Sequence, residues 1–231
     1  MKTIGLLGGM TCESTVPYYR IINRCVNERL GGEHSAKLIL YSVDFEEIEI
    51  LQTEERWDEA GRILGELAAR LEGAGADFLV LCTNTMHKVV PLIESHVRIP
   101  LLHIVDVTAR AIAQKGFHRV GLLGTRFTME QSFYRSRLEN PHGLEVLVPP
   151  EADRLEVHRI IVEELAGGKL LDSSRTEYVR IIDDLAARGA EGVILGCTEI
   201  PLLVQAQDTK VPVFDTTALH ARAAALYALG E

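Results

Sequence analysis

Two short polar segments carry the residue types in this chain that could do chemistry. The first, Thr83-Asn84-Thr85-Met86-His87, directly follows the apolar run 78–82. The second, Cys197-Thr198-Glu199, directly follows the run Val193-Ile194-Leu195-Gly196. Polar groups that end a buried strand lie where ligands bind in α/β proteins. A cysteine placed there could act as a base or nucleophile, because backbone N–H groups and a following helix start lower a thiol's pKa and favour the thiolate.

Each segment also has a purely structural interpretation. A lone buried cysteine is more often a small hydrophobic residue, and Asn84 or Thr85 could simply accept N–H bonds as a helix cap. Glu199 could polarise Cys197 or only favour a helix N-terminus, and His87 could orient the site or cap. The polar Thr198-Glu199 context favours a functional role for Cys197 over a structural one. Its pairing with Cys197 favours a functional role for the first segment as well. The roles of Glu199 and His87 stay open.

The elements that must position these segments follow a β-α-β rhythm. Apolar runs at 3–7, 37–41 and 78–81 predict strands, and the longer amphipathic stretches between and after them predict helices over 14–30, 57–71 and 86–95. Strands that alternate with helices are typical of a mostly parallel sheet.

The second half of the chain repeats the first. Residues 4–8 reappear as 120–124, residues 75–84 as 189–198, and residues 99–102 as 211–214, in the same order. We therefore predict two pseudo-symmetric α/β lobes, each a mostly parallel sheet flanked by helices. The first lobe would comprise 1–100 plus 213–231 and the second 101–212, which is a usual domain size. The active site would lie in the cleft between them, with Thr83 opposite Cys197.

These residues resemble the cofactor-independent aspartate/glutamate racemases, whose relatives include hydantoin racemase, maleate isomerase and arylmalonate decarboxylase. The resemblance rests on Gly5-Leu-Leu-Gly8-Gly9-Met10, Asn84-Thr85-Met86-His87, Gly196-Cys197-Thr198-Glu199 and the duplication, which together cover nearly the whole chain. It implies a cysteine at the end of each lobe, one on either face of the substrate's α-carbon. One thiolate removes the α-proton, the opposite thiol returns another, and no pyridoxal phosphate takes part. The resemblance also implies a homodimer.

The chain departs from the family pattern at the first cysteine. Thr83 stands where the family has the cysteine before Asn-Thr, and Cys82 lies one residue earlier. Alternation along the strand points Cys82 to the other side, into the core, unless a bulge re-aims it. A threonine hydroxyl is a poor base for a carbon acid. By resemblance, Cys197 takes the proton of an L-amino acid and Thr83 delivers one to the other face, so racemisation should be slow or favour the L-isomer.

The residues expected to bind the substrate surround these two ends. Backbone N–H groups and hydroxyls around Asn84, Thr85 and Thr198 would hold the α-carboxylate, and Met10 would wall the pocket. The basic residues that aspartate-specific members carry have no counterpart in the corresponding stretches 43–52 and 160–165, which are mainly acidic and apolar. Arg126, next to Thr125, is the best candidate for a side-chain carboxylate. Gln52 is a weaker polar candidate, for which a solvated loop position is slightly favoured. His103 and Asp215 are equivalent in the repeat, and their roles stay open.

Composition excludes several classes of partner. With 24 basic against 33 acidic residues the formal charge is −9, which disfavours nucleic acid and anionic membranes. No apolar stretch approaches a membrane span, and no signal sequence is recognisable, so a cytoplasmic protein is expected. The four cysteines lack metal or redox spacing, and no pyridoxal lysine or metal-ligand cluster is recognisable, so no cofactor is expected.

The sequence thus predicts an isomerase, a pyridoxal-independent racemase of aspartate, glutamate or a related amino acid. Two alternatives remain: a single-cysteine decarboxylase of the arylmalonate decarboxylase type, and a non-catalytic protein that binds small acids.

Overall fold

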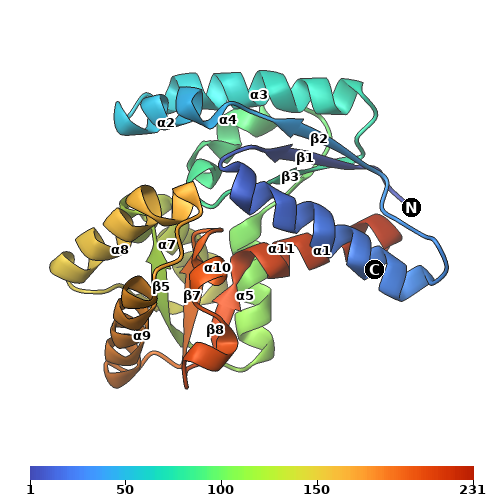
Figure 1. Cartoon of the computed structure of the whole chain (residues 1–231). Coiled ribbons are helices and arrows are strands. Elements are labelled where there is room, and N and C mark those ends of the chain that lie inside the picture. Colours follow the sequence, from blue (N-terminus) through green and yellow to red (C-terminus); the bar gives the residue numbers. More distant parts are fainter. The chain divides into compact units, whose positions relative to one another are not determined.

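Each half of the chain forms a four-stranded, all-parallel sheet with helices packed against it (Figure 1). The computed structural model describes all of residues 1–231, which form two units. Unit 1 comprises Met1–Ile104 and His220–Glu231, and unit 2 comprises Val105–Leu219. No helix is both long enough and apolar enough to cross a membrane.

The first unit has the strand order β2-β1-β3-β4. Its elements are β1 (Ile4–Gly8), α1 (Cys12–Leu30), β2 (Leu38–Ser42), α2 (Phe45–Thr53), α3 (Trp57–Gly73), β3 (Phe78–Leu81), the 3-10 helix η1 (Thr85–Val89), α4 (Val90–Glu94), β4 (Leu101–Leu102) and the His220 to Leu229 part of α11 (Thr216–Leu229).

The second unit has the equivalent order β6-β5-β7-β8. Its elements are α5 (Ile104–Gln114), which begins at the unit boundary, β5 (Arg119–Gly124), α6 (Arg126–Glu130), α7 (Ser132–His142), β6 (Glu145–Leu147), α8 (Glu151–Glu163), η2 (Leu165–Gly167), α9 (Asp172–Ala187), β7 (Gly192–Gly196), α10 (Ile200–Leu203), η3 (Ala206–Asp208) and β8 (Val213–Asp215).

The central strands of the unit 1 sheet, β1 and β3, are buried on both faces, as is typical of a parallel sheet. One face packs against α2, α3 and α4 in a cluster that contains Leu64 and Ile93. The opposite face packs against α1 through Tyr18 and Ile22, and against the alanine-rich side of α11. In unit 2, one face of the sheet forms a cluster with α8, α9 and α10.

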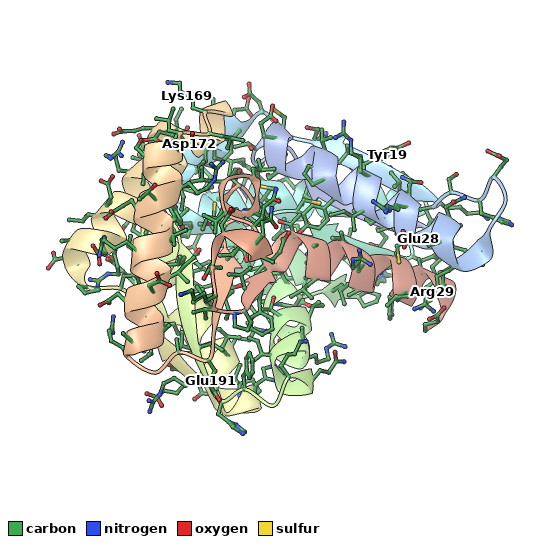
Figure 2. All side chains as sticks on the ribbon, turned by 60° about the horizontal axis from the view of Figure 1, so that its bottom comes forward. Tyr19, Glu28, Arg29, Lys169, Asp172 and Glu191 are labelled. Carbon is green, nitrogen blue, oxygen red and sulfur yellow. The ribbon has the colours of Figure 1, made fainter.

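The duplication extends to a hydrogen bond made by the acidic residue just before β3 and just before β7. Just before β3, Asp77 accepts the backbone N–H of Thr3 at 2.6 Å. Just before β7, Glu191, labelled in Figure 2, accepts the N–H groups of His118 and Arg119 at 2.6 and 2.8 Å. Both acids follow a glycine with φ of +98°, Gly75 and Gly189. The repeat in the sequence therefore reports a repeated turn with the same backbone and the same kind of hydrogen bond.

The unit boundaries differ from those expected at residues 100 and 212. Leu101 and Leu102 form β4, which pairs with β3, so the stretch through Ile104 belongs to unit 1. Val213–Asp215 form β8, which pairs with β7, so the stretch through Leu219 belongs to unit 2. The sequence expectation cut each lobe before its last strand because these strands are only two and three residues long.

Two local expectations also need correction. The helix predicted over 86–95 is a 3-10 turn, η1, followed by the short α4, with Pro91 in the first turn of α4. Asn84 precedes η1, and its side chain makes no capping hydrogen bond there, so Asn84 is not the helix cap that the structural interpretation offered.

Candidate active site

Cys197 occupies the first position after β7 and is buried, with 7% of its surface exposed. Its Sγ donates to Oε2 of Glu199 at 2.9 Å, and the hydroxyl of Thr198 donates to the same oxygen at 2.9 Å. The preceding Gly196 permits this placement, because a Cβ there would lie 2.8 Å from the carbonyl oxygen of Leu123 on β5. The open question about Glu199 is thereby answered: its carboxylate is the hydrogen-bond acceptor of the thiol.

The environment raises the pKa of the Cys197 thiol well above its ordinary value. Burial is the largest cause, and the negative charge and hydrogen bond of Glu199 add to it, while the backbone N–H groups of Thr198 and Glu199 oppose it. The sequence argument was therefore wrong about the net direction. It considered only the backbone N–H groups and the following helix, which lower a thiol's pKa. However, α10 has only four residues, and desolvation raises the pKa by more than these effects lower it.

Thr83 lies two residues after the last residue of β3 and is also buried. Its N–H donates to the carbonyl of Leu81 at 2.9 Å, which turns the chain out of the strand. Its own carbonyl faces Nδ1 of His87 at 2.7 Å. The backbone of Thr83, whose hydroxyl is the predicted proton donor, is therefore hydrogen-bonded through both its N–H and its carbonyl.

Cys82 belongs to the core, as the alternation of the strand predicts. It shares a cluster with Phe78 and Val80, whereas Leu79 and Leu81 belong to the cluster on the opposite face. The strand pairs with β1 in unbroken register, without a bulge. Burial raises the pKa of the Cys82 thiol, so it remains protonated at neutral pH.

The other residues singled out in unit 1 lie near the carboxyl edge of its sheet. Met10 is buried, in one cluster with Ile48 and Leu51 of α2, and Gln52 is the next residue of that helix and is also buried. The turn before Met10 requires glycine, because Gly9 has φ of +90° and a Cβ there would lie 2.5 Å from the backbone of Val43. The remaining three, Asn84, Thr85 and His103, are all buried.

The residues singled out in unit 2 are less uniform. Thr125 caps α6 by accepting the N–H of Thr128 at 3.4 Å. Arg126 is exposed, with its guanidinium 4.8 Å from the ring centroid of Phe127 and no ion pair. The N–H of Thr198 is directed at Cys197 and its hydroxyl at Glu199. Asp215 accepts the N–H of Ala218 at 2.9 Å, and burial raises the pKa of its carboxyl.

No group of three or more His, Cys, Asp or Glu side chains is arranged to hold a metal ion. The chemistry that these two strand ends can do is acid-base chemistry. A thiol paired with a carboxylate can release and accept a proton, and a hydroxyl can deliver one.

The model of the Asp/Glu/hydantoin racemase family matches residues 7–224. The chain belongs to this family. Among curated racemases, it is similar to the broad specificity amino-acid racemase RacX of Bacillus subtilis (strain 168), with 24% identity over 228 residues that cover 95% of both chains. It also matches the glutamate racemase of Persephonella marina, with 28% identity over 141 residues, which cover 60% of this chain and 52% of that protein.

Solved structures of the racemase family share the fold. A Yersinia pestis protein, named only provisionally as an Asp/Glu racemase, superposes with a TM-score of 0.92 and 58% identity, over 99% of this chain and 100% of that one. An aspartate racemase homologue from Pyrococcus horikoshii OT3 superposes with a TM-score of 0.85 and 40% identity, over 99% of this chain and 100% of that one. The Francisella tularensis glutamate racemase in complex with D-glutamate superposes with a TM-score of 0.67 over 99% of this chain and 80% of that one. The sequence identity is 16%, so this similarity shows the fold alone.

Sequence reasoning missed a hydrogen-bonded pair that packs beside His87. Tyr18 and His220 are hydrogen-bonded at 2.9 Å although 202 residues separate them, and His220 lies in an alanine-rich helix with no motif around it. His87 was noted but left without a role. The sequence contains no signal that could have paired Tyr18 with His220, because this contact joins segments from opposite ends of the chain.

Proposed function

We propose that this protein is a pyridoxal-independent racemase of aspartate, glutamate or a related amino acid, in which Cys197 and Thr83 serve opposite faces of the α-carbon. The observation that carries the proposal is the hydrogen bond from the Cys197 thiol to the Glu199 carboxylate, at the end of a buried strand in a member of the racemase family. A structural cysteine needs no such acceptor.

Cys197 is the base for the L-isomer in this proposal. Its resting form is the thiol, because burial and Glu199 raise its pKa. Transfer of the thiol proton to Glu199 across the 2.9 Å hydrogen bond creates the thiolate without importing a charge into the buried site. The thiolate then takes the α-proton, and the electron pair of the C–H bond passes into the carboxylate of the substrate.

Thr83 completes the reaction from the other face. Its hydroxyl, directly or through a water molecule, gives a proton to the planar carbanion and forms the D-isomer. Solvent carries the extra proton from Glu199 back to Thr83, so the cycle closes without loss or gain of protons. The reverse reaction would require the Thr83 hydroxyl to act as a base, for which it is poorly suited, so the L-isomer should be the better substrate.

The substrate's side chain would be an acid if Arg126 takes part in binding. Arg126 supports this because it is exposed and its guanidinium has no carboxylate partner in the structure. The α-carboxylate would be bound at the buried turn containing Asn84 and Thr85, the polar segment after β3.

The test follows the α-proton of a panel of L- and D-amino acids in D₂O by NMR, with dialysed wild-type protein and no added cofactor. We expect exchange and racemisation of an acidic amino acid, fastest from the L-isomer, and neither reaction in Cys197→Ser. Strict dependence on added pyridoxal phosphate would contradict the proposal.

Two outcomes would assign the protein elsewhere. Decarboxylation of an arylmalonate without racemisation would indicate the single-cysteine decarboxylase, a reaction that needs one proton donor and fits the core position of Cys82. Saturable binding of an amino acid without deuterium incorporation would indicate a binding protein.

A further inference from the structure

His87 holds a single, defined protonation state between two segments of unit 1. It is buried, with 3% of its surface exposed, and lies in η1, four residues after Thr83. Nδ1 lies 2.7 Å from the carbonyl oxygen of Thr83, and Nε2 accepts the N–H of Ile104 at 3.2 Å. A carbonyl can only accept and a backbone N–H can only donate. The ring is therefore neutral, with its proton on Nδ1 and directed at Thr83.

Neighbouring aromatic groups restrict this ring. The rings of His103 and His220 pack edge-on against His87, with centroids 4.5 and 5.9 Å away. His220 donates from Nε2 to the carbonyl of Leu102 at 2.8 Å, so its Nδ1 accepts the hydroxyl of Tyr18 at 2.9 Å. Burial lowers the pKa of His220 to about 4, so this ring is neutral too. The three imidazoles form a packed layer, in which the rings of His87 and His220 are uncharged.

The peptide that follows Thr83 lies beyond the sheet. The register of β3 with β1 ends at Leu81, and the last sheet-like bond is from the N–H of Cys82 to Leu7. Past that point, the Thr83 N–H bonds to Leu81 and the Thr83 carbonyl to His87. The His87 bond therefore fixes the peptide plane on the carboxyl side of Thr83, and so restrains the backbone from which the Thr83 side chain projects.

We propose that His87 is a positioning residue that aims the Thr83 hydroxyl at the face of the α-carbon opposite Cys197. This inference rests on the proposed function. It predicts that His87 governs how the carbanion partitions between the two faces, while the Cys197 step is left nearly unchanged. A merely structural role, in which His87 only joins η1 to the start of α5 through Ile104, predicts no change in that partition.

Two amide variants separate the two hydrogen bonds. In His87→Asn, the side-chain NH₂ reaches the Nδ1 position and keeps the donor to Thr83, but nothing reaches the Ile104 N–H. In His87→Gln, the carbonyl oxygen reaches the Nε2 position and keeps the acceptor for Ile104, but the donor to Thr83 is lost. Each variant is thus the matched control of the other, with one hydrogen bond removed in each.

The measurement starts from the L-isomer in D₂O and determines the ratio of D-isomer formed to deuterium in the recovered L-isomer. We expect His87→Gln to lower this ratio about tenfold, because small misplacements of a catalytic group are costly. L-isomer exchange should stay within about twofold, and His87→Asn should keep the wild-type ratio. An unchanged ratio in His87→Gln, or an equal fall in both variants, would overturn the inference.

A measurement on the wild type keeps the inference testable if His87→Gln does not fold. The ¹⁵N NMR signals of His87 should show a neutral ring protonated on Nδ1, and a proton on Nε2 would overturn the inference. If wild type exchanges no amino-acid α-proton, the proposed function and this inference both fail. If wild type racemises an amino acid and only the ratio test fails, the proposed function stands and His87 has no positioning role.

Discussion

The carboxyl ends of β3 and β7 occupy equivalent places in a duplicated fold, yet they hold their key residues in different ways. At β7, the side chain of Cys197 is bound by a carboxylate two residues further on. At β3, the backbone of Thr83 is bound by an imidazole four residues further on. The repeat places Thr85 opposite Glu199 and Pro201 opposite His87, so neither half has the residue that the other uses.

The difference matches what each side chain needs. A thiol titrates, so its neighbours decide when it loses a proton, and Glu199 acts on that property directly. A threonine hydroxyl does not titrate in the range where proteins are folded, so its surroundings can control only its position. In the proposed mechanism, one end of the fold therefore controls protonation and the other controls geometry. The predictions below test this division.

The largest effect should come from removing the thiol. Cys197→Ser should lower α-proton exchange by at least about 10²–10⁴-fold, the usual contribution of a general base. Cys82→Ala, the matched control, should keep most of the activity because Cys82 is a core residue. Initial exchange rates in D₂O measure both. A greater loss in Cys82→Ala than in Cys197→Ser would reverse the assignment of the two cysteines.

The second prediction concerns stability at the histidine layer of unit 1. His220 has a pKa of about 4 in the fold, lowered by burial from 6.5. As the pH falls from 6.5 to 4, the unfolded chain takes up a proton there and the folded chain does not, so the free energy of unfolding decreases. The loss from this group is about 3 kcal/mol.

The measurement is urea unfolding at several pH values. His220→Gln should be less stable at neutral pH, because Tyr18 loses its acceptor, but should lose about 3 kcal/mol less than wild type between pH 6.5 and 4. The exposed His34, changed to Gln, is the control and should follow the wild-type curve. Parallel curves for wild type and His220→Gln would show that His220 is not held neutral.

The third prediction isolates Glu199. Glu199→Gln should lower racemisation about tenfold or more, because the thiol loses a charged hydrogen-bond acceptor. The same change should lower the pKa of Cys197, since it removes a negative charge that raises it. Alkylation by iodoacetamide, followed on the Cys197 peptide by mass spectrometry, should therefore begin at lower pH in the variant. The exposed Cys12 serves as the internal control. Unchanged alkylation would refute the role of Glu199.

The smallest effect should come from making the two ends alike. Thr83→Cys supplies a second thiol where the family pattern has one, with little change in side-chain volume. We expect a rise of about a few-fold in exchange from the D-isomer, since a thiol is a better base than a hydroxyl. Comparison of α-deuterium exchange from both isomers tests this. Equal exchange of both isomers by the wild-type protein would contradict the unequal site.

Much of the fold followed from local patterns in the sequence. Alternating apolar runs located the strands, and the repeated segments indicated two mostly parallel sheets, which the strand pairing confirms. The period of two along β3 placed Cys82 in the core, as observed. These features could be predicted because burial of successive side chains depends on backbone geometry within a few residues.

The sequence by itself determined which residues end the two central strands, Thr83 and Cys197, and therefore the kind of chemistry available. Only the tertiary structure decided their state. Desolvation, which reverses the expected shift of the Cys197 pKa, depends on packing by α8, α9 and α10, and no local pattern reports it. The bond from His87 to Ile104 and that from Tyr18 to His220 join residues far apart in the chain. Such contacts exist only once the sheet has brought those segments together.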